Sequence, residues 1–273
     1  MNKINQPRPQ YFEVFRALHH GGLSLLLNRK TLLPMTMIPT VVTFLTLMLM
    51  RGGMPQDTSP FLMAVVQIPS DFVTGLLCAL IIFIILSAPK KRDNEKPVIF
   101  TLNLNEKKGL FISAALANVV FSYFLNGMYG LLTLIYEPLQ QASQTAETPP
   151  SMAAITGLSI LLFILFYAVR FIMLPVLIIA HNDIRGFFAR NKQVGFSFPI
   201  FVLKILTTFS IGFCVLMISS PFLASASGEG QSIPTIQLAI IDFITAFGSV
   251  LSSAWVYAAL AVGYRQMTEG KVK

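Results

Sequence analysis

The amino-acid sequence predicts an all-α polytopic membrane protein: a bundle of six transmembrane helices with an N-terminal interfacial amphipathic helix. Three observations carry this prediction. The 273 residues are 54% hydrophobic and only 12% charged, and the mean hydropathy is +0.68, which is more apolar than a water-soluble core of this size holds. Six apolar runs are long enough to cross a bilayer. The basic residues gather in alternate connections between these runs.

The amphipathic helix is expected before the first apolar run. Its apolar residues recur at helical spacing, and they are Phe12, Phe15, Leu18 and Leu25 or Leu26. The polar residues that lie elsewhere around the turn are Glu13, Arg16 and His20. A helix lying along the inner leaflet fits this pattern. The alternative is an extension of the first span.

The six spans follow from the length of the apolar runs, since about 20 helical residues cross about 30 Å of hydrocarbon. They cover residues 32–50, 61–87, 109–136, 152–181, 196–222 and 235–263. Pro and Gly interrupt several of them, which helices in lipid tolerate when neighbouring groups satisfy the freed backbone. The predicted organisation is a cytoplasmic arm with the interfacial helix (1–31), a six-span domain (32–263) and a cytoplasmic tail (264–273).

Orientation is predicted by the distribution of Lys and Arg. All but three of the 20 lie in the N-terminal arm, the second and fourth connections and the tail. The exceptions are Arg51 in the first connection and Arg170 and Lys204 within spans. The positive-inside rule then places both termini in the cytoplasm. The net charge of +8 therefore reflects the orientation in the membrane and does not indicate nucleic-acid binding.

The second connection, SAPKKRDNEKPVIFTLNLNEKKG, is the longest on the inner side. Its VIFTLNLN stretch alternates apolar and polar residues, which is typical of a short extended segment.

Two basic residues within the spans lie at matched depth. Arg170 is about two turns below the expected cytoplasmic boundary, and Lys204 lies eight residues into a span that enters from the same face. One interpretation is that both side chains snorkel to anionic headgroups. The other is an electropositive pocket between helices for a lipid phosphate or another anion, because Arg can hold phosphate through two hydrogen bonds.

Two acidic residues also fall in apolar runs. Asp71 follows a proline and a serine in QIPSDFVTGLL. Ser70 or Asp71 is expected to cap a helix that starts there, leaving 61–68 as an outer loop or re-entrant piece, and a proton- or cation-coupling carboxylate is the alternative. Asp242, in TIQLAIIDFITAF, is expected to make an interhelical polar contact rather than serve in a relay. Since Asp242 and Arg170 lie at opposite depths, the sequence shows no neutralising pair.

No residue pattern indicates catalysis, a cofactor or a metal. The sequence lacks a P-loop lysine motif, GxSxG and HExxH. His19, His20 and His181 have no metal-ligand spacing with nearby carboxylates, and His181 suits a helix boundary. Cys78 and Cys214 fall in apolar runs as small packing residues. The protein is therefore predicted not to be an enzyme.

Small residues in the last span are interpreted as helix-packing positions rather than catalytic ones. They are Gly248, Ser249, Ser252 and Ser253.

Parts of the chain resemble a known family. The stretches are Phe15 to Pro39, VRFIMLPVLIIAHNDIRGFFARN, and the closing YRQM. They look like YciC-like bacterial six-span inner-membrane proteins and the related membrane domain of some glycerophosphodiester phosphodiesterases. The likeness covers most of the chain in layout, but only Arg170, Pro175, Tyr264 and Arg265 as individual positions. The family's short helix after the fourth span is only partly present in GFFARNKQVGF. The resemblance implies a bundle and supplies no catalytic residues.

Two functions are compatible with these patterns. The favoured one is a non-enzymatic envelope protein that binds or organises phospholipid or partner membrane proteins, with Arg170 and Lys204 on anionic headgroups at the cytoplasmic face. The alternative is a secondary transporter or permease for a small or anionic substrate, for which Asp71, Arg170, Lys204 and Asp242 are the candidate residues. A lipid enzyme is disfavoured because no nucleophile, base and metal set is visible. Expected partners are membrane lipids, other membrane proteins or a second copy of the chain, and no nucleic acid.

Overall fold

The computed structural model describes residues 12–55, 58–87, 107–144, 152–191, 194–224 and 235–269. These ranges are almost entirely helical and contain no strand, so the predicted all-α class is confirmed. Six helical segments in them are long and apolar enough to cross a membrane. The VIFTLNLN stretch lies outside the described residues.

The spans agree closely with the predicted apolar runs. Their helices are α2 (Arg29–Gly53), α3 (Pro60–Ser87), α4 (Lys108–Gln144), α5 (Met152–Ala168) with its continuation, α8 (Val194–Ala224) and α9 (Thr235–Glu269). Two short helices accompany them, α1 (Val14–Leu27) and α7 (Ile184–Arg190). Both predicted domain limits fall inside helices, because α2 begins at Arg29 and α9 continues to Glu269.

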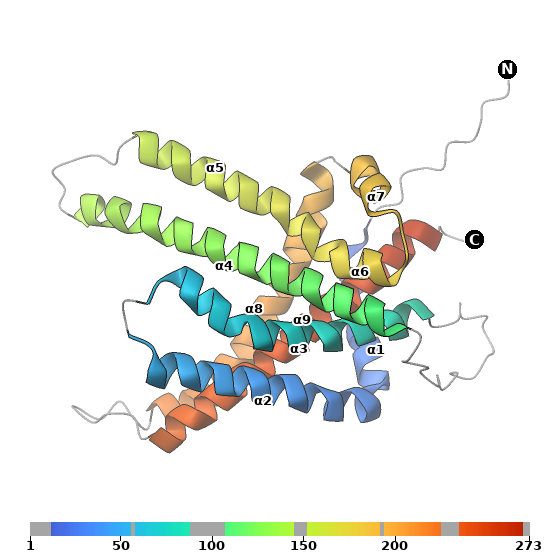
Figure 1. Ribbon diagram of the computed structural model, residues 1–273, viewed down its shortest axis with the longest axis horizontal. Coiled ribbons are helices and arrows are strands. Elements are labelled where there is room, and N and C mark those ends of the chain that lie inside the picture. Colours follow the sequence, from blue (N-terminus) through green and yellow to red (C-terminus); the bar gives the residue numbers. More distant parts are fainter. Residues whose placement is uncertain are drawn as a thin grey trace.

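The six spans alternate in direction between two ends of the molecule. Figure 1 shows the C-terminal ends of α2, α4 and α8 on the left, beside the N-terminal ends of α3, α5 and α9. The other helix ends lie towards the right, together with α1 and α7. α9 is the central helix of the bundle, since it packs against α1, α2, α3 and α8. The alternation is the one that the charge distribution predicts.

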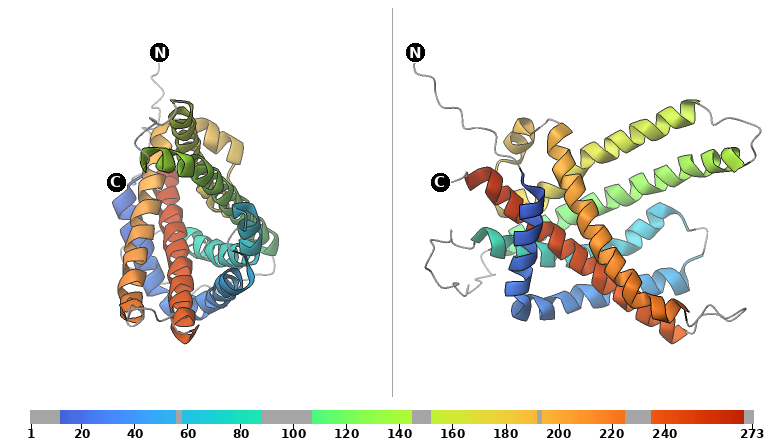
Figure 2. Two further views of the ribbon diagram at one scale, coloured as in Figure 1. Left: turned by 90° about the vertical axis from the view of Figure 1, so that its left-hand side faces the viewer. Right: turned by 180° about the vertical axis from the view of Figure 1, so that it is seen from behind.

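α1 is a separate helix that lies across one end of the bundle, and not an extension of the first span. It runs at a steep angle to α2 in Figure 1 and in the right-hand view of Figure 2. Gly21 allows close docking on α9, because a Cβ there would lie 2.7 Å from the backbone nitrogen of Ala259. The indole Nε1 of Trp255 donates to the Leu18 carbonyl at 3.0 Å. The chain bends at Asn28 before α2 begins.

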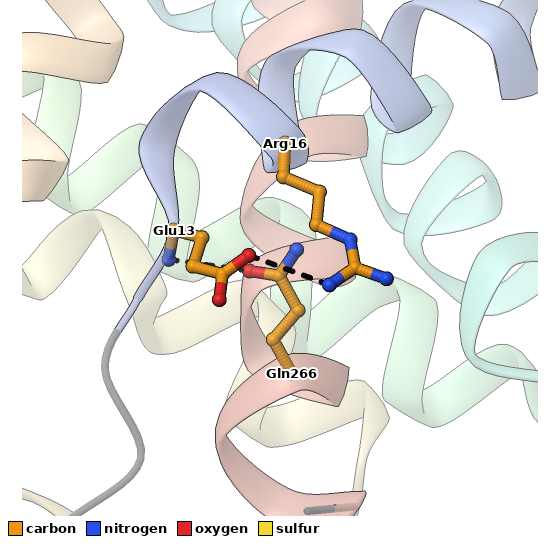
Figure 3. Close-up of polar contacts among 3 residues, drawn as sticks. All are labelled: Glu13, Arg16 and Gln266. Atoms are coloured by element: carbon orange, nitrogen blue, oxygen red, sulfur yellow. Dashed lines mark hydrogen bonds and ion pairs between the residues drawn. The ribbon is translucent and has the colours of Figure 1, made fainter. Parts of the chain in front are cut away.

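The beginning of α1 is also held on α9. The Glu13 backbone N–H donates to Oε1 of Gln266 at 3.3 Å, and Nη1 of Arg16 lies 3.4 Å from Oε2 of Glu13 (Figure 3). Both side chains of this ion pair are largely exposed, so it adds little stability. The contact with Gln266 instead fixes where the chain enters the helix.

The apolar face predicted for α1 is divided in two. Phe12 and Leu18 are buried in the bundle, whereas Phe15 is 77% and Leu26 is 61% exposed. One side of α1 therefore binds α9, and the other presents large apolar side chains outward. The outward side is what an interfacial helix offers to lipid.

The fourth span is not one uninterrupted helix. α5 passes into a 3₁₀ segment, Val169–Met173, and then into α6, Leu174–Ile179. Pro175 has no N–H to bond the carbonyl of Phe171 four residues earlier. The Leu174 N–H bonds that carbonyl instead, which is the tighter 3₁₀ spacing.

α6 ends at Ile179, and His181 lies just beyond its cap Ala180, as the sequence predicts for a boundary residue. His181 has φ 52°, in the left-handed region. Its N–H bonds the Ile178 carbonyl, and the Asn182 N–H bonds that of Leu177, each at 3.1 Å. This pair of bonds is the Schellman motif, in which glycine usually holds the left-handed position. The Asn182 side chain then donates to the Tyr264 hydroxyl at 3.0 Å.

One local prediction is wrong. Residues 61–68 are neither an outer loop nor a re-entrant piece, because α3 is continuous from Pro60 and carries Pro69 inside it. Neither Ser70 nor Asp71 caps a helix. The hydroxyl of Ser70 instead shares a 2.6 Å hydrogen bond with that of Thr43 on α2. Neighbouring helices make an internal proline tolerable in a membrane span, so Pro69 does not mark a boundary.

Candidate functional site

A cavity of about 380 Å³ lies among α3, α4, α8 and α9, near the middle of these helices. We call it the central cavity. Its polar lining consists of Asp71 and Thr74 on α3, Asn118 and Ser122 on α4, Lys204 and Thr208 on α8, and Thr245, Ser249, Ser252, Ser253 and Tyr257 on α9. So many polar groups at mid-span are costly in hydrocarbon, and such groups mark functional sites in membrane proteins.

The space for the cavity comes from small side chains on α9. Thr245, Ser249 and Ser252 follow one another at four and three residues, so they share one face of the helix. Gly248, next to them, packs closely on α8, since a Cβ there would lie 2.3 Å from Cγ2 of Val215. Gly248 therefore serves helix packing as predicted and also lines the cavity, together with the neighbouring serines.

Two opposite charges line the central cavity from different helices. Asp71 belongs to α3 and Lys204 to α8. The Ser122 hydroxyl lies beside the Asp71 carboxyl group, and Nζ of Lys204 lies 5.6 Å from the centroid of the Phe121 ring. Asp71 and Lys204 form no ion pair with each other. The structure thus brings together two residues that the sequence analysis considered separately.

A series of hydrogen bonds links α9, α4 and α3 beside the central cavity. The Tyr257 hydroxyl lies 2.7 Å from Oδ1 of Asn118, and Nδ2 of Asn118 donates to the backbone carbonyl of Asp71 at 3.1 Å. A second bond joins α4 to α3: Nδ2 of Asn126 donates to Oε1 of Gln67 at 2.9 Å. These bonds fix α4 and α9 relative to the backbone that carries Asp71.

Sequence reasoning missed Asn118 and Tyr257, although a signal was present. Asn118, Ser122 and Asn126 recur every four residues in an otherwise apolar run, so they lie on one face of α4. Gln67 and Asp71 repeat the same spacing on α3. Two polar stripes of this kind predict that the helices face each other through them.

Arg170 lies away from the central cavity. It is only 2% exposed, with Nε donating to the Tyr167 carbonyl at 3.1 Å and Nη1 to that of Asn191 at 3.3 Å. The guanidinium carbon lies 3.2 Å from the centroid of the Tyr167 ring. Protein covers this guanidinium, so snorkelling does not describe it, and it shares no pocket with Lys204. Two of its nitrogens bind the backbone around the 3₁₀ segment and the end of α7.

Asp242 is held in an interhelical ion pair. Its side chain is 7% exposed, and Oδ1 lies 2.7 Å from Nη2 of Arg51. The pair joins the last turn of α2 to α9, beside an edge-on contact of the Phe44 and Phe243 rings. The sequence indicated no neutralising pair because Arg51 was counted only as a residue of a connection. Both lie towards the same end of the bundle, but Arg51 is two residues from the end of α2 and Asp242 seven residues from the start of α9.

The central cavity, lined by one cationic side chain, one anionic side chain and several hydroxyl groups, suits reversible binding of a polar molecule. No family model, curated protein or solved structure matches this chain. The similarity to YciC-like proteins therefore remains a prediction, and the role of the site is argued from its residues.

Proposed function

We propose that this protein is a secondary transporter of a bacterial cytoplasmic membrane, which binds a small substrate in the central cavity. The end that carries α1 and α7 faces the cytoplasm, in keeping with the basic residues there. The observation that carries the proposal is the position of the cavity. Lys204 is ten residues from the start of α8 and Asp71 eleven from the start of α3, about 15 Å in each case. That is the middle of about 30 Å of hydrocarbon, where transporters hold their substrates.

The position of the charged side chains favours transport over phospholipid organisation. The lipid role requires Arg170 and Lys204 to reach headgroups at the membrane surface. Arg170 binds two backbone carbonyls instead, and Lys204 lines a cavity at mid-span. Neither cation is therefore held at the headgroup layer under this proposal.

Phospholipid organisation is the second candidate, and the outward face of α1 favours it. Phe15, Leu26 and Leu27 are 77%, 61% and 84% exposed. Large apolar side chains on a helix that lies across the bundle end suit insertion among the acyl chains of one leaflet. This contact would anchor the end of the bundle without using the central cavity.

Filling the cavity tests the proposal. Gly212 lines it, and a Cβ there would have no neighbour within 4 Å, so Gly212→Phe adds a ring at the cavity wall without a steric clash. Gly157 on α5 has equally free surroundings and does not line the cavity, which makes Gly157→Phe the matched control. After equilibration with cell extract in nanodiscs, native mass spectrometry should find a small molecule retained by the wild type and by Gly157→Phe, and lost from Gly212→Phe. Retention of the same molecule by Gly212→Phe, or none by the wild type, would contradict transport through this cavity.

A further inference from the structure

We infer that the ligand of the central cavity is a small zwitterion with an apolar part, whose ammonium group binds Asp71 and whose anionic group binds Lys204. This inference rests on the proposed function, because it names the substrate class of the same cavity.

The first argument is the placement of the two charges. α9 packs against both α3 and α8, so Asp71 and Lys204 reach the cavity from helices on either side of it. Neither side chain has an oppositely charged partner among the described residues. A carboxylate and an ammonium at mid-span without partners are expensive, and each is stabilised by a group of opposite charge.

The second argument is the balance of charge. A singly charged ligand would neutralise one of the two side chains and leave the other uncompensated. A zwitterion neutralises both and brings no net charge into the hydrocarbon. Charge-assisted hydrogen bonds at both ends would also fix its orientation.

The third argument is the rest of the lining. The cavity walls include Phe121, Leu125, Ile172 and Val215 beside the polar groups. A volume of about 380 Å³ is at the small end of ligand sites, which combine apolar walls with a few polar groups. The ligand is therefore expected to carry an apolar portion next to its two charges.

Two sources offer this chemistry. One is a free molecule of the amino-acid type, with an ammonium, a carboxylate and an apolar side chain. The other is the ammonium and phosphate headgroup of a zwitterionic phospholipid such as phosphatidylethanolamine. Both place an ammonium beside Asp71 and an anionic oxygen beside Lys204.

Matched probes test the charge requirement. Leucine is the zwitterion, 4-methylpentanoate lacks its ammonium and 3-methylbutylamine lacks its carboxylate. Apparent affinities are measured from the rise in melting temperature with each probe, in nanodiscs of phosphatidylglycerol. The wild type should bind leucine at least about tenfold more tightly than either analogue, since each analogue loses one charge-assisted contact.

Two near-isosteric variants make the test reciprocal. Asp71→Asn should weaken leucine about tenfold or more and should bind 4-methylpentanoate as well as leucine. Lys204→Gln should likewise weaken leucine binding, and it should bind 3-methylbutylamine as well as leucine. A change of preference of this kind cannot come from a misfolded variant. Equal wild-type binding of all three probes, or equal loss of all three in a variant, would overturn the inference.

A separate experiment tests whether a phospholipid headgroup is the ligand. Phosphatidylethanolamine is added to the discs, and native mass spectrometry measures how much stays bound to the protein. Retention by the wild type and loss from both charge variants supports the inference with a lipid as the source, whereas a leucine response supports a free solute. If phosphatidylethanolamine retention is unchanged in both variants and leucine binds no better than its analogues, the inference is overturned. The proposed function survives that outcome if Gly212→Phe still displaces some other molecule, and fails with it if Gly212→Phe displaces none.

Discussion

Replacing Gly75 with leucine is expected to lower the free energy of unfolding by about 3 kcal/mol or more, since overpacking typically costs 1–3 kcal/mol even where side chains can shift. Here the obstacle is backbone. A Cβ at Gly75 would lie 2.9 Å from Cα and 3.1 Å from the carbonyl oxygen of Ala115, so α3 and α4 are in close backbone contact here. The two helices must separate to admit a larger residue.

The same substitution is expected to disrupt the central cavity. The added Cβ would also lie 3.2 Å from Cβ of Asn118, whose amide bonds the Asp71 carbonyl and the Tyr257 hydroxyl. Thermal unfolding in nanodiscs and ligand retention measure the two effects. The control is Gly157→Leu, where the surroundings are free and loss of a helical glycine should stabilise by up to about 1 kcal/mol. Equal stability of the two variants would contradict the close approach of α3 and α4.

The second large effect is expected at the ion pair of Arg51 and Asp242. Breaking a buried pair by removing one partner costs about 3–5 kcal/mol. The Arg51 side chain is 47% exposed, which reduces the effect, and we expect Arg51→Met to lower the free energy of unfolding by roughly 2 kcal/mol. The loss comes from the Asp242 carboxylate, which is 7% exposed in the pair and would be left without its partner.

Two further variants isolate the cause. Adding Asp242→Asn to Arg51→Met removes the stranded charge and should recover most of the lost stability. Arg16→Met breaks the exposed pair with Glu13 and should cost less than about 1 kcal/mol. Equilibrium unfolding in mixed micelles compares all three with the wild type. If Arg51→Met costs no more than Arg16→Met, the pair with Asp242 is not buried as described.

The transmembrane fold was accessible from sequence because its main determinants are local. The hydropathy of each run depends only on that run, so all six spans were found to within a few residues. The interpretation of residues 61–68 as a loop was the one local error. Pro69 breaks a helix in water, but in a bundle its freed carbonyl can be satisfied by neighbours, which the local sequence does not reveal.

Only part of the candidate site could be predicted from the sequence. Asp71 and Lys204 stand out as charges in apolar runs, but their shared cavity depends on which faces of α3, α8 and α9 meet. Arg170 shows the same limit. Its acceptors include the Asn191 carbonyl beyond α7, and no local pattern predicts that contact.

The central claim is that a water-accessible polar cavity lies at mid-span, and thiol labelling tests it most directly. Thiol reagents react with thiolates, which form in water and not in hydrocarbon. Ser252→Cys, in a background of Cys78→Ala and Cys214→Ala, places the thiol on the cavity lining. Native Cys214, which is exposed on α8 but does not line the cavity, is the comparison, in a Cys78→Ala background. A charged, water-soluble methanethiosulfonate should modify the cysteine at position 252 and leave Cys214 unmodified. An unreactive cysteine at position 252, or equal reaction at both positions, would contradict the cavity.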